Sequence, residues 1–151
     1  MGKGTGEGMR KNMDLEIFLK QNKVKKENIK FAASESFKNN GKAVLWEIKA
    51  ISADEDIRIR ESCMKNSFDE NLKKYKKVFD PREYALKLCA ASTVYPDLKN
   101  AALQESYGVM GEERLLGKML TGGEYERYLE KVQQINGYGK AMNELKEEAK
   151  N

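Results

Sequence analysis

The apolar side chains of this sequence follow two different spacings. Residues 28–33 and 44–51 are short apolar-rich runs, and in the second run the apolar positions, Trp46 among them, alternate with polar ones. Such alternation is typical of half-buried strands. The turn at 39–41 contains Asn and Gly, which tolerate positive φ. The pattern therefore predicts a β-hairpin, with Trp46 packing it onto other elements.

Most other apolar positions recur at helical spacing. Ser52 and Thr121 each precede a glutamate by three residues, which is the spacing of a capping box. Asp80 and Pro81 combine a good N-cap with proline at the first helical position. Tyr95 lies at the end of the helix expected there, on its core face. Helices are predicted over residues 14–21, 52–64, 80–95, 100–107, 111–120, 121–136 and 139–148.

Two segments carry no regular apolar pattern. Residues 1–12 contain four glycines and are predicted to be a disordered leader, with the fold beginning near residue 13. Residues 66–79 are polar and lysine-rich, and we expect a flexible connector or a weak helix. The expected fold is α+β but mostly α, in one domain. In it a short N-terminal helix and the hairpin, within 13–65, pack on a bundle of short helices formed by 80–151.

The composition of the chain argues against several kinds of chemistry. The 151 residues include no histidine, which removes the commonest general base and a common metal ligand. Cys63 and Cys89 lie far apart without zinc-site spacing, and we expect both to be reduced, buried thiols. No apolar run approaches the roughly 20 residues needed to span a bilayer. We therefore expect a cytoplasmic protein that is not an enzyme and has no cofactor, metal or membrane partner.

The net charge of +4 is unevenly distributed. The basic excess lies in the first fifty residues, in a lysine cluster. The cluster comprises Lys20, Lys23, Lys25, Lys26 and Lys30. It fits either a nucleic-acid site or a solvated surface, and the modest overall basicity favours the solvated surface.

Several blocks of the sequence stand out by their order and spacing. They are Phe18–Asn22, Trp46–Ile48, Arg60–Cys63, Thr93–Leu98, Leu103–Gly111, Met119–Tyr125 and Val132–Gly137. In this order and spacing they resemble the XkdN-like family of phage tail assembly chaperones, and the resemblance extends from about residue 13 to the C-terminus.

The resemblance implies a non-structural helper of tail assembly. Such chaperones bind the tape measure protein, keep it soluble, promote polymerisation of the tail tube around it and leave before the tail is complete. They are often made in two lengths by a programmed translational frameshift. The ending Lys150-Asn151 fits an A-rich slippery stretch, so we expect this chain to be the shorter product. The alternatives are a small prophage nucleic-acid-binding regulator and a structural tail subunit.

Partner contact is expected around the interhelical turns of the second half. Candidate residues are Tyr95, Tyr107, Val109, Met110 and Tyr138. Tyrosine offers an apolar ring and a polar tip, which suits an interface that must open again. The competing interpretation is that these tyrosines only cap the edge of the core. The expected partners are the tape measure protein, the tail tube protein through a longer product, and other copies of the chain.

Overall fold

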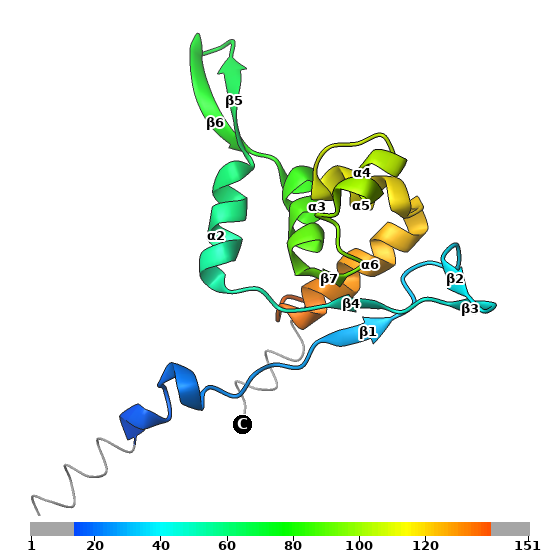
Figure 1. Ribbon diagram of the computed structural model, residues 1–151. Helices are drawn as coiled ribbons and strands as arrows, with labels where there is room; N and C mark the ends of the chain where they lie inside the picture. The colour runs from blue at the N-terminus through cyan, green and yellow to red at the C-terminus, as the bar shows by residue number, and fades with distance from the viewer. Residues whose placement is uncertain (1–13, 140–151) are drawn as a thin grey trace, which may run out of the picture.

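The computed structural model describes residues 14–139, which form helices and three small antiparallel sheets (Figure 1). The strands are β1 (Ile29–Phe31), β2 (Lys38–Asn39), β3 (Lys42–Ala43), β4 (Trp46–Ile48), β5 (Met64–Asp69), β6 (Lys74–Phe79) and β7 (Thr93–Tyr95). The helices are η1 (Lys20–Asn22), α2 (Ala53–Ser62), α3 (Pro81–Ser92), α4 (Ala101–Ser106), α5 (Glu112–Met119) and α6 (Gly122–Ile135). Within this part of the chain, no helix is long and apolar enough to cross a bilayer.

The central sheet has the strand order β1-β4-β7. β1 pairs antiparallel with β4, and the register places Phe31 opposite Trp46. β7 pairs with the other edge of β4, with Ile48 opposite Thr93. The third strand corrects the sequence prediction, which continued the helix to Tyr95. β-Branched Thr93 and Val94 end the helix because they fit a pleated strand better than a helical turn.

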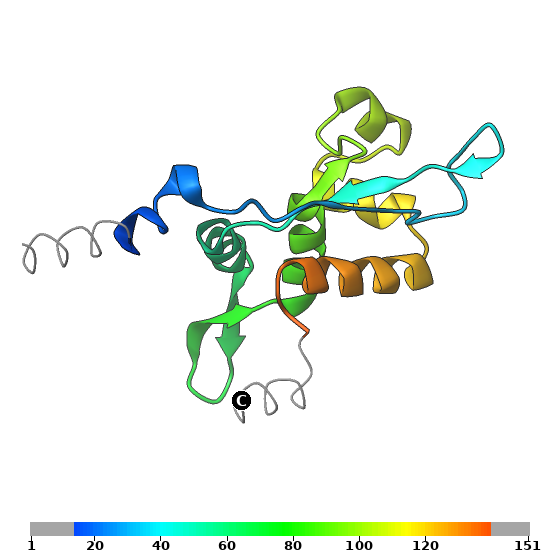
Figure 2. The same ribbon diagram turned by 90° about the horizontal axis from the view of Figure 1, so that it is seen from below.

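The core lies between this sheet and helices α3, α5 and α6. The sheet contributes the buried side chains of Trp46 and Ile48 to this core, as the alternating pattern predicted. Tyr128 of α6 packs its ring against Phe31 at 5.5 Å and edge-on against Trp46 at 5.6 Å. In Figure 2 α6 runs alongside the sheet, so its apolar stripe covers the sheet residues. Cys89 lies in the same core, where burial raises the pKa of its thiol to about 12.

The β5–β6 hairpin replaces the flexible connector or weak helix predicted for 66–79. Its two six-residue strands pair from Met64↔Phe79 to Asp69↔Lys74 and project away from the rest of the molecule (Figure 1). A second short hairpin, β2–β3, uses the predicted Asn-Gly turn, where Asn40 has φ 53° and Gly41 has φ 78°. The prediction of a mostly helical bundle is therefore wrong, and the fold is a mixed α+β structure.

The N-terminal segment also departs from its predicted place. Its helical structure is limited to one turn at 14–16 and η1, and Leu15, Ile17 and Phe18 are exposed. This segment extends away from the helices instead of packing on them (Figure 1). The expected leader at 1–12 and all but the first residue of the expected helix at 139–148 lie outside the described residues.

The predicted helix starts are present and fix where the helices begin. The Ser52 hydroxyl accepts from the Glu55 amide at 3.1 Å, although only one half of the expected capping box is seen there. Asp80 accepts from the amides of Arg82 and Glu83. Thr121 and Glu124 form a complete capping box. These caps satisfy amides that have no partner inside their own helix.

Candidate functional site

An open apolar groove lies between α3, α5 and α6. Its volume is about 540 Å³, within the range of sites that hold small molecules or several side chains. Apolar side chains dominate its walls. The lining residues are Pro81, Arg82, Ala85, Leu86, Gly117, Leu120, Thr121, Gly122, Tyr125 and Leu129. The groove is open to solvent, so a helix or loop of another protein can reach its apolar lining.

The walls of the groove begin at the two capped helix starts. Asp80 and Pro81 start α3, so Ala85 and Leu86 lie in its second turn. The Thr121 capping box starts α6 and places Tyr125 on the opposite wall. At Gly117 of α5, a Cβ would lie 4.0 Å from Leu86 Cδ2, which is ordinary van der Waals contact. Glycine at this position leaves the groove floor wider than a larger side chain would.

The lining of the groove is mostly apolar. Its titratable lining groups are Arg82, at an exposed rim position, and Tyr125. Burial raises the pKa of Tyr125 to about 12, which keeps its hydroxyl protonated. Within residues 14–139, no cluster of three or more Cys, Asp or Glu side chains is arranged to hold a metal ion. The groove is an apolar surface with one cation, Arg82, at its edge, and this suits the binding of an apolar partner.

The residues predicted for partner contact lie in different places. Tyr95 is 54% exposed and lines a hollow of about 230 Å³ together with Pro96, Leu103 and Met119. Val109 and Met110 line another hollow of about 380 Å³ beside α4. Met110 is 87% exposed, whereas Tyr107 is half-buried against the core. Both hollows include residues of α4, and their role in partner contact stays a prediction.

Tyr138 does not join the other predicted residues. Its hydroxyl donates to Asp56 Oδ2 at 3.0 Å, on the α2 side of the molecule, away from α4 (Figure 1). Asp56 also accepts from Tyr84 and from Arg60 Nε, the latter at 2.9 Å. Burial raises the pKa of Asp56, but the hydrogen bonds from Tyr84, Arg60 and Tyr138 outweigh burial and lower it below its ordinary value.

Part of the N-terminal lysine cluster has partners within the fold. Lys26 donates to the carbonyl oxygen of Ile135, and Lys30 lies 3.6 Å from the Glu47 carboxylate. These contacts fasten the approach to β1 onto α6 and β4. Two of the five lysines of the cluster therefore have contacts within the fold.

A family model for the phage XkdN-like tail assembly chaperone protein matches residues 15–150. That match covers nearly the whole chain. The chain belongs to the XkdN-like family of phage tail assembly chaperones.

Relatives of this XkdN-like chain agree with the assignment. It is 30% identical over 142 residues to the phage-like element PBSX protein XkdN of Bacillus subtilis (strain 168), covering 91% of this chain and 94% of that protein. It is also 30% identical over 142 residues to the protein YqbN of the same organism, covering 91% and 93%. A crystal structure of the protein YqbN superposes with a TM-score of 0.70 at 24% identity, over 83% of this chain and 98% of that one. The XkdN-like chain therefore shares its fold with YqbN.

Sequence reasoning missed the groove of this XkdN-like chaperone, although part of its signal was visible. Tyr125 and Leu129 are spaced four apart on the α6 helix, beside the buried positions Tyr128 and Val132. They widen the apolar face beyond what the sheet covers. Whether a neighbouring element would cover that extra width depends on how α3 and α5 pack, which periodicity alone does not give.

Proposed function

We propose that this XkdN-like chaperone binds the phage tape measure protein in the host cytoplasm, keeps it soluble and promotes polymerisation of the tail tube around it. The observation that carries the proposal is the open apolar groove between α3, α5 and α6 in a member of a tail assembly chaperone family. An amphipathic helix of the tape measure protein fits this groove by placing successive apolar side chains along it.

The physical chemistry of tail assembly supports this choice of partner. A long helical protein that will later be enclosed by a tube exposes apolar helix surface beforehand, and such surface aggregates. A chaperone that is 34% charged adds solubility to whatever it covers. Release requires each contact to be weak, so many copies bound along one tape measure protein provide the strength.

Two later steps belong to the same proposal. The chaperone leaves before the tail is complete, and it is therefore absent from the finished particle. A longer product of a programmed frameshift brings in the tail tube protein. Lys150 and Asn151 lie outside the described residues, so this step rests on the family resemblance.

A co-expression pull-down tests the binding step. The tagged chaperone is expressed with the tape measure protein of its own gene cluster, and the soluble fraction is analysed. We expect the wild-type chaperone to keep the tape measure protein soluble and bound. Ala85→Glu places a charge and four further heavy atoms inside the groove, and should lower the captured amount about tenfold or more.

The matched control is Ala102→Glu, the same substitution at an exposed alanine of α4 that does not line the groove. It should capture as much tape measure protein as the wild type, and circular dichroism should show both variants folded. If neither the wild type nor the control keeps the tape measure protein soluble, the proposed function fails. If Ala85→Glu binds like the wild type, binding stands and the groove is not its site.

A further inference from the structure

Within residues 14–139, the β5–β6 hairpin is an arm that contacts the rest of the fold near its base. Nearly all side chains of its strands are exposed, and only Asp69 and Phe79 are half-buried. The two strands form a sheet of their own, so in the described part of the chain neither outer edge pairs with a third strand. An isolated two-stranded hairpin is only marginally stable in water. Its persistence as six residue pairs therefore depends on how its base is held.

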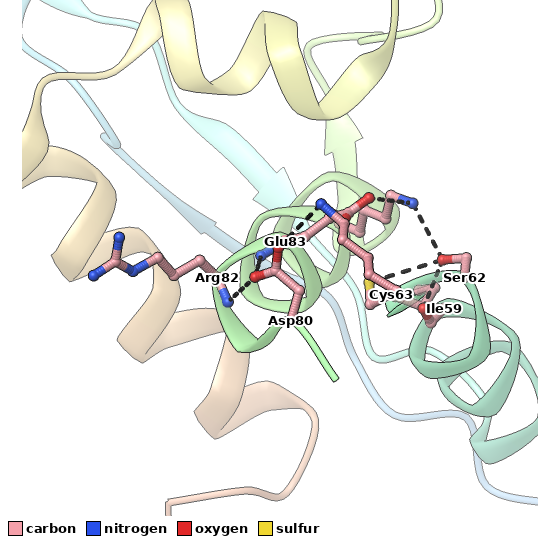
Figure 3. A network of polar contacts seen from close by, with 8 residues as sticks. Ile59, Ser62, Cys63, Asp80, Arg82 and Glu83 are labelled. Atoms are coloured by element: carbon pink, nitrogen blue, oxygen red, sulfur yellow. Dashed lines mark hydrogen bonds and ion pairs between the residues drawn. The ribbon is translucent and has the colours of Figure 1, made fainter. Parts of the chain in front are cut away.

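A polar network holds the base of the hairpin against α2 and α3. Lys65 Nζ lies 3.1 Å from an Asp80 carboxylate oxygen and 2.9 Å from one of Glu83. Lys87 pairs with Glu83 at 3.0 Å and donates to the Ser62 hydroxyl at 3.2 Å (Figure 3). The Asp80 amide donates to the Cys63 carbonyl oxygen at 2.9 Å. These contacts join the two ends of the hairpin and set the direction in which it projects.

The strand register divides the arm into two faces. Successive side chains of a strand alternate between faces, and paired residues share one. Phe68 and Tyr75 are therefore on the same face, with ring centroids 5.1 Å apart in an edge-on arrangement. Phe68 is 50% exposed and Tyr75 is 75% exposed. The outer half of the arm thus presents an aromatic pair to solvent.

Positive charge is concentrated on the β6 side of the arm. Lys74, Lys76 and Lys77 belong to β6, and Lys73 precedes it. Lys76 lies 3.5 Å from Asp69, whereas Lys73, Lys74 and Lys77 form no ion pair with any residue in 14–139. On β5, the one lysine is engaged at the base. The open edge of β6 is therefore cationic, with Lys74 and Lys76 on one face and Lys77 on the other face, beside Tyr75.

The chemistry of this edge favours protein over nucleic acid. Residues 64–79 contain no arginine, so the arm lacks the bidentate donors that grip phosphates and bases. Asp69 and Glu70 stand at the turn, where they would repel phosphate. An extended peptide can instead add its backbone to the open strand edge and place alternate side chains against Tyr75 and the lysines.

We propose that the outer edge of β6 docks an extended acidic segment of a partner protein. The segment pairs with β6 as a third strand, its carboxylates lie on the face of Lys74 and Lys76, and its apolar side chains lie on the other face, against Tyr75. This proposal goes beyond tape measure binding, because it uses a surface that does not include the α3–α5–α6 groove. The addition of a third strand would also stabilise the marginal outer half of the hairpin.

Titration of the full chain, labelled with ¹⁵N, tests the proposal. The probe is a short synthetic peptide of alternating Glu and Val, and the comparison peptide alternates Lys and Val. We expect the acidic peptide to shift the amide signals of residues 72–79 and to bind more weakly as salt rises. The basic peptide should leave those signals unchanged. Lys74→Glu combined with Lys76→Glu, on the face that the carboxylates approach, should weaken binding about tenfold or more.

The matched control combines Lys38→Glu with Lys42→Glu, which makes the same charge change on exposed lysines of the β2–β3 hairpin. It should bind the acidic peptide within about twofold of the wild type. Equal binding by both double variants overturns the proposal, as does an acidic peptide that shifts nothing in 72–79. A single-stranded oligonucleotide that binds the arm more tightly than the peptide also overturns it. So do shifts of these signals with protein concentration alone, which would indicate a second copy of the chain.

Discussion

Three separate segments of the chain meet at the carboxylate of Asp56. Tyr84 from α3, Arg60 from its own helix α2, and Tyr138 beyond α6 all donate to it. Arg60 also stacks over the Tyr84 ring, 4.3 Å from its centroid. A carboxylate with several donors is stabilised in its charged form, and the charged form in turn holds the donors. Asp56 therefore ties α2 and the end of the described chain to α3.

Replacing Asp56 should remove a contribution to the free energy of unfolding that is lost at acid pH. Asp56→Asn removes the charge at nearly constant shape, and we expect a loss of about 2 kcal/mol in the free energy of unfolding at pH 7. Because the pKa of Asp56 is lowered in the fold, its contribution is present above the unfolded value near 4 and is lost as the pH falls through the folded value. The difference between wild type and variant should narrow below about pH 4 in denaturant titrations.

Asp54→Asn provides the control for that experiment. Asp54 pairs with Arg58 at 2.7 Å, but both side chains are mostly exposed. Its replacement should cost less than about 0.5 kcal/mol. A loss of stability as large as that of Asp56→Asn would mean that negative charge in the first turn of α2, rather than the shared carboxylate of Asp56, determines the effect.

At the level of elements, sequence reasoning succeeded where one short signal determines the outcome. The caps at Asp80 and Thr121 mark helix starts because a single side chain satisfies the first amides. The β5–β6 hairpin gave no such signal. Its lysines have low strand propensity, and the pairing of Phe68 with Tyr75 becomes visible only when the two strands are placed in register.

The same contrast between local signals and contacts of distant residues explains how much of the candidate site could be predicted. Met110 is exposed beside a glycine turn, but sequence alone did not indicate this, because methionine fills gaps in cores as readily as it lies on partner surfaces. The pairing of Tyr138 with Asp56 joins residues 82 positions apart, and no local pattern predicts it. The groove likewise depends on how three helices from different parts of the chain approach one another.

Removal of the hairpin should leave the body folded. The strand ends already meet at the Met64↔Phe79 pair, and a Gly-Gly turn can replace residues 65–78 between them. Since nearly all of the removed side chains are exposed, the free energy of unfolding should change by no more than about 1 kcal/mol. Urea titration measures this, and loss of cooperative unfolding would show that the hairpin is part of the core.

On the scale of the whole molecule, the fold is closed by contacts between its first and last parts. β4 lies between β1 and β7, which come from different halves of the described chain. The Ile51 amide donates to Asn136 Oδ1 at 2.9 Å, and Asn136 Nδ2 donates to the Ser92 hydroxyl at 3.1 Å. Thr93 donates to the Cys89 carbonyl oxygen, so its bond with Tyr128 uses the tyrosine hydroxyl as donor.

Tyr128 should be among the most sensitive positions in the protein. Tyr128→Ala removes a ring that is fully buried between sheet and helices, at an expected cost of about 3–5 kcal/mol. Tyr128→Phe loses only the bond to Thr93 and should cost about 1 kcal/mol. Tyr75→Ala, at a mostly exposed tyrosine, should change stability by less than about 0.5 kcal/mol. Denaturant unfolding of the three variants checks this order, and similar costs for both alanine variants would contradict it.

The placement of β4 in the middle of the sheet has a consequence for synthesis on the ribosome. Trp46 and Ile48 are made early, but the helix that covers them ends only at Ile135. At translation speeds of 5–20 residues per second, these apolar side chains wait on the order of 10 s for their cover. During that interval the nascent chain exposes its own aggregation-prone surface. A member of a tail assembly chaperone family is thus itself prone to aggregate while it is being made.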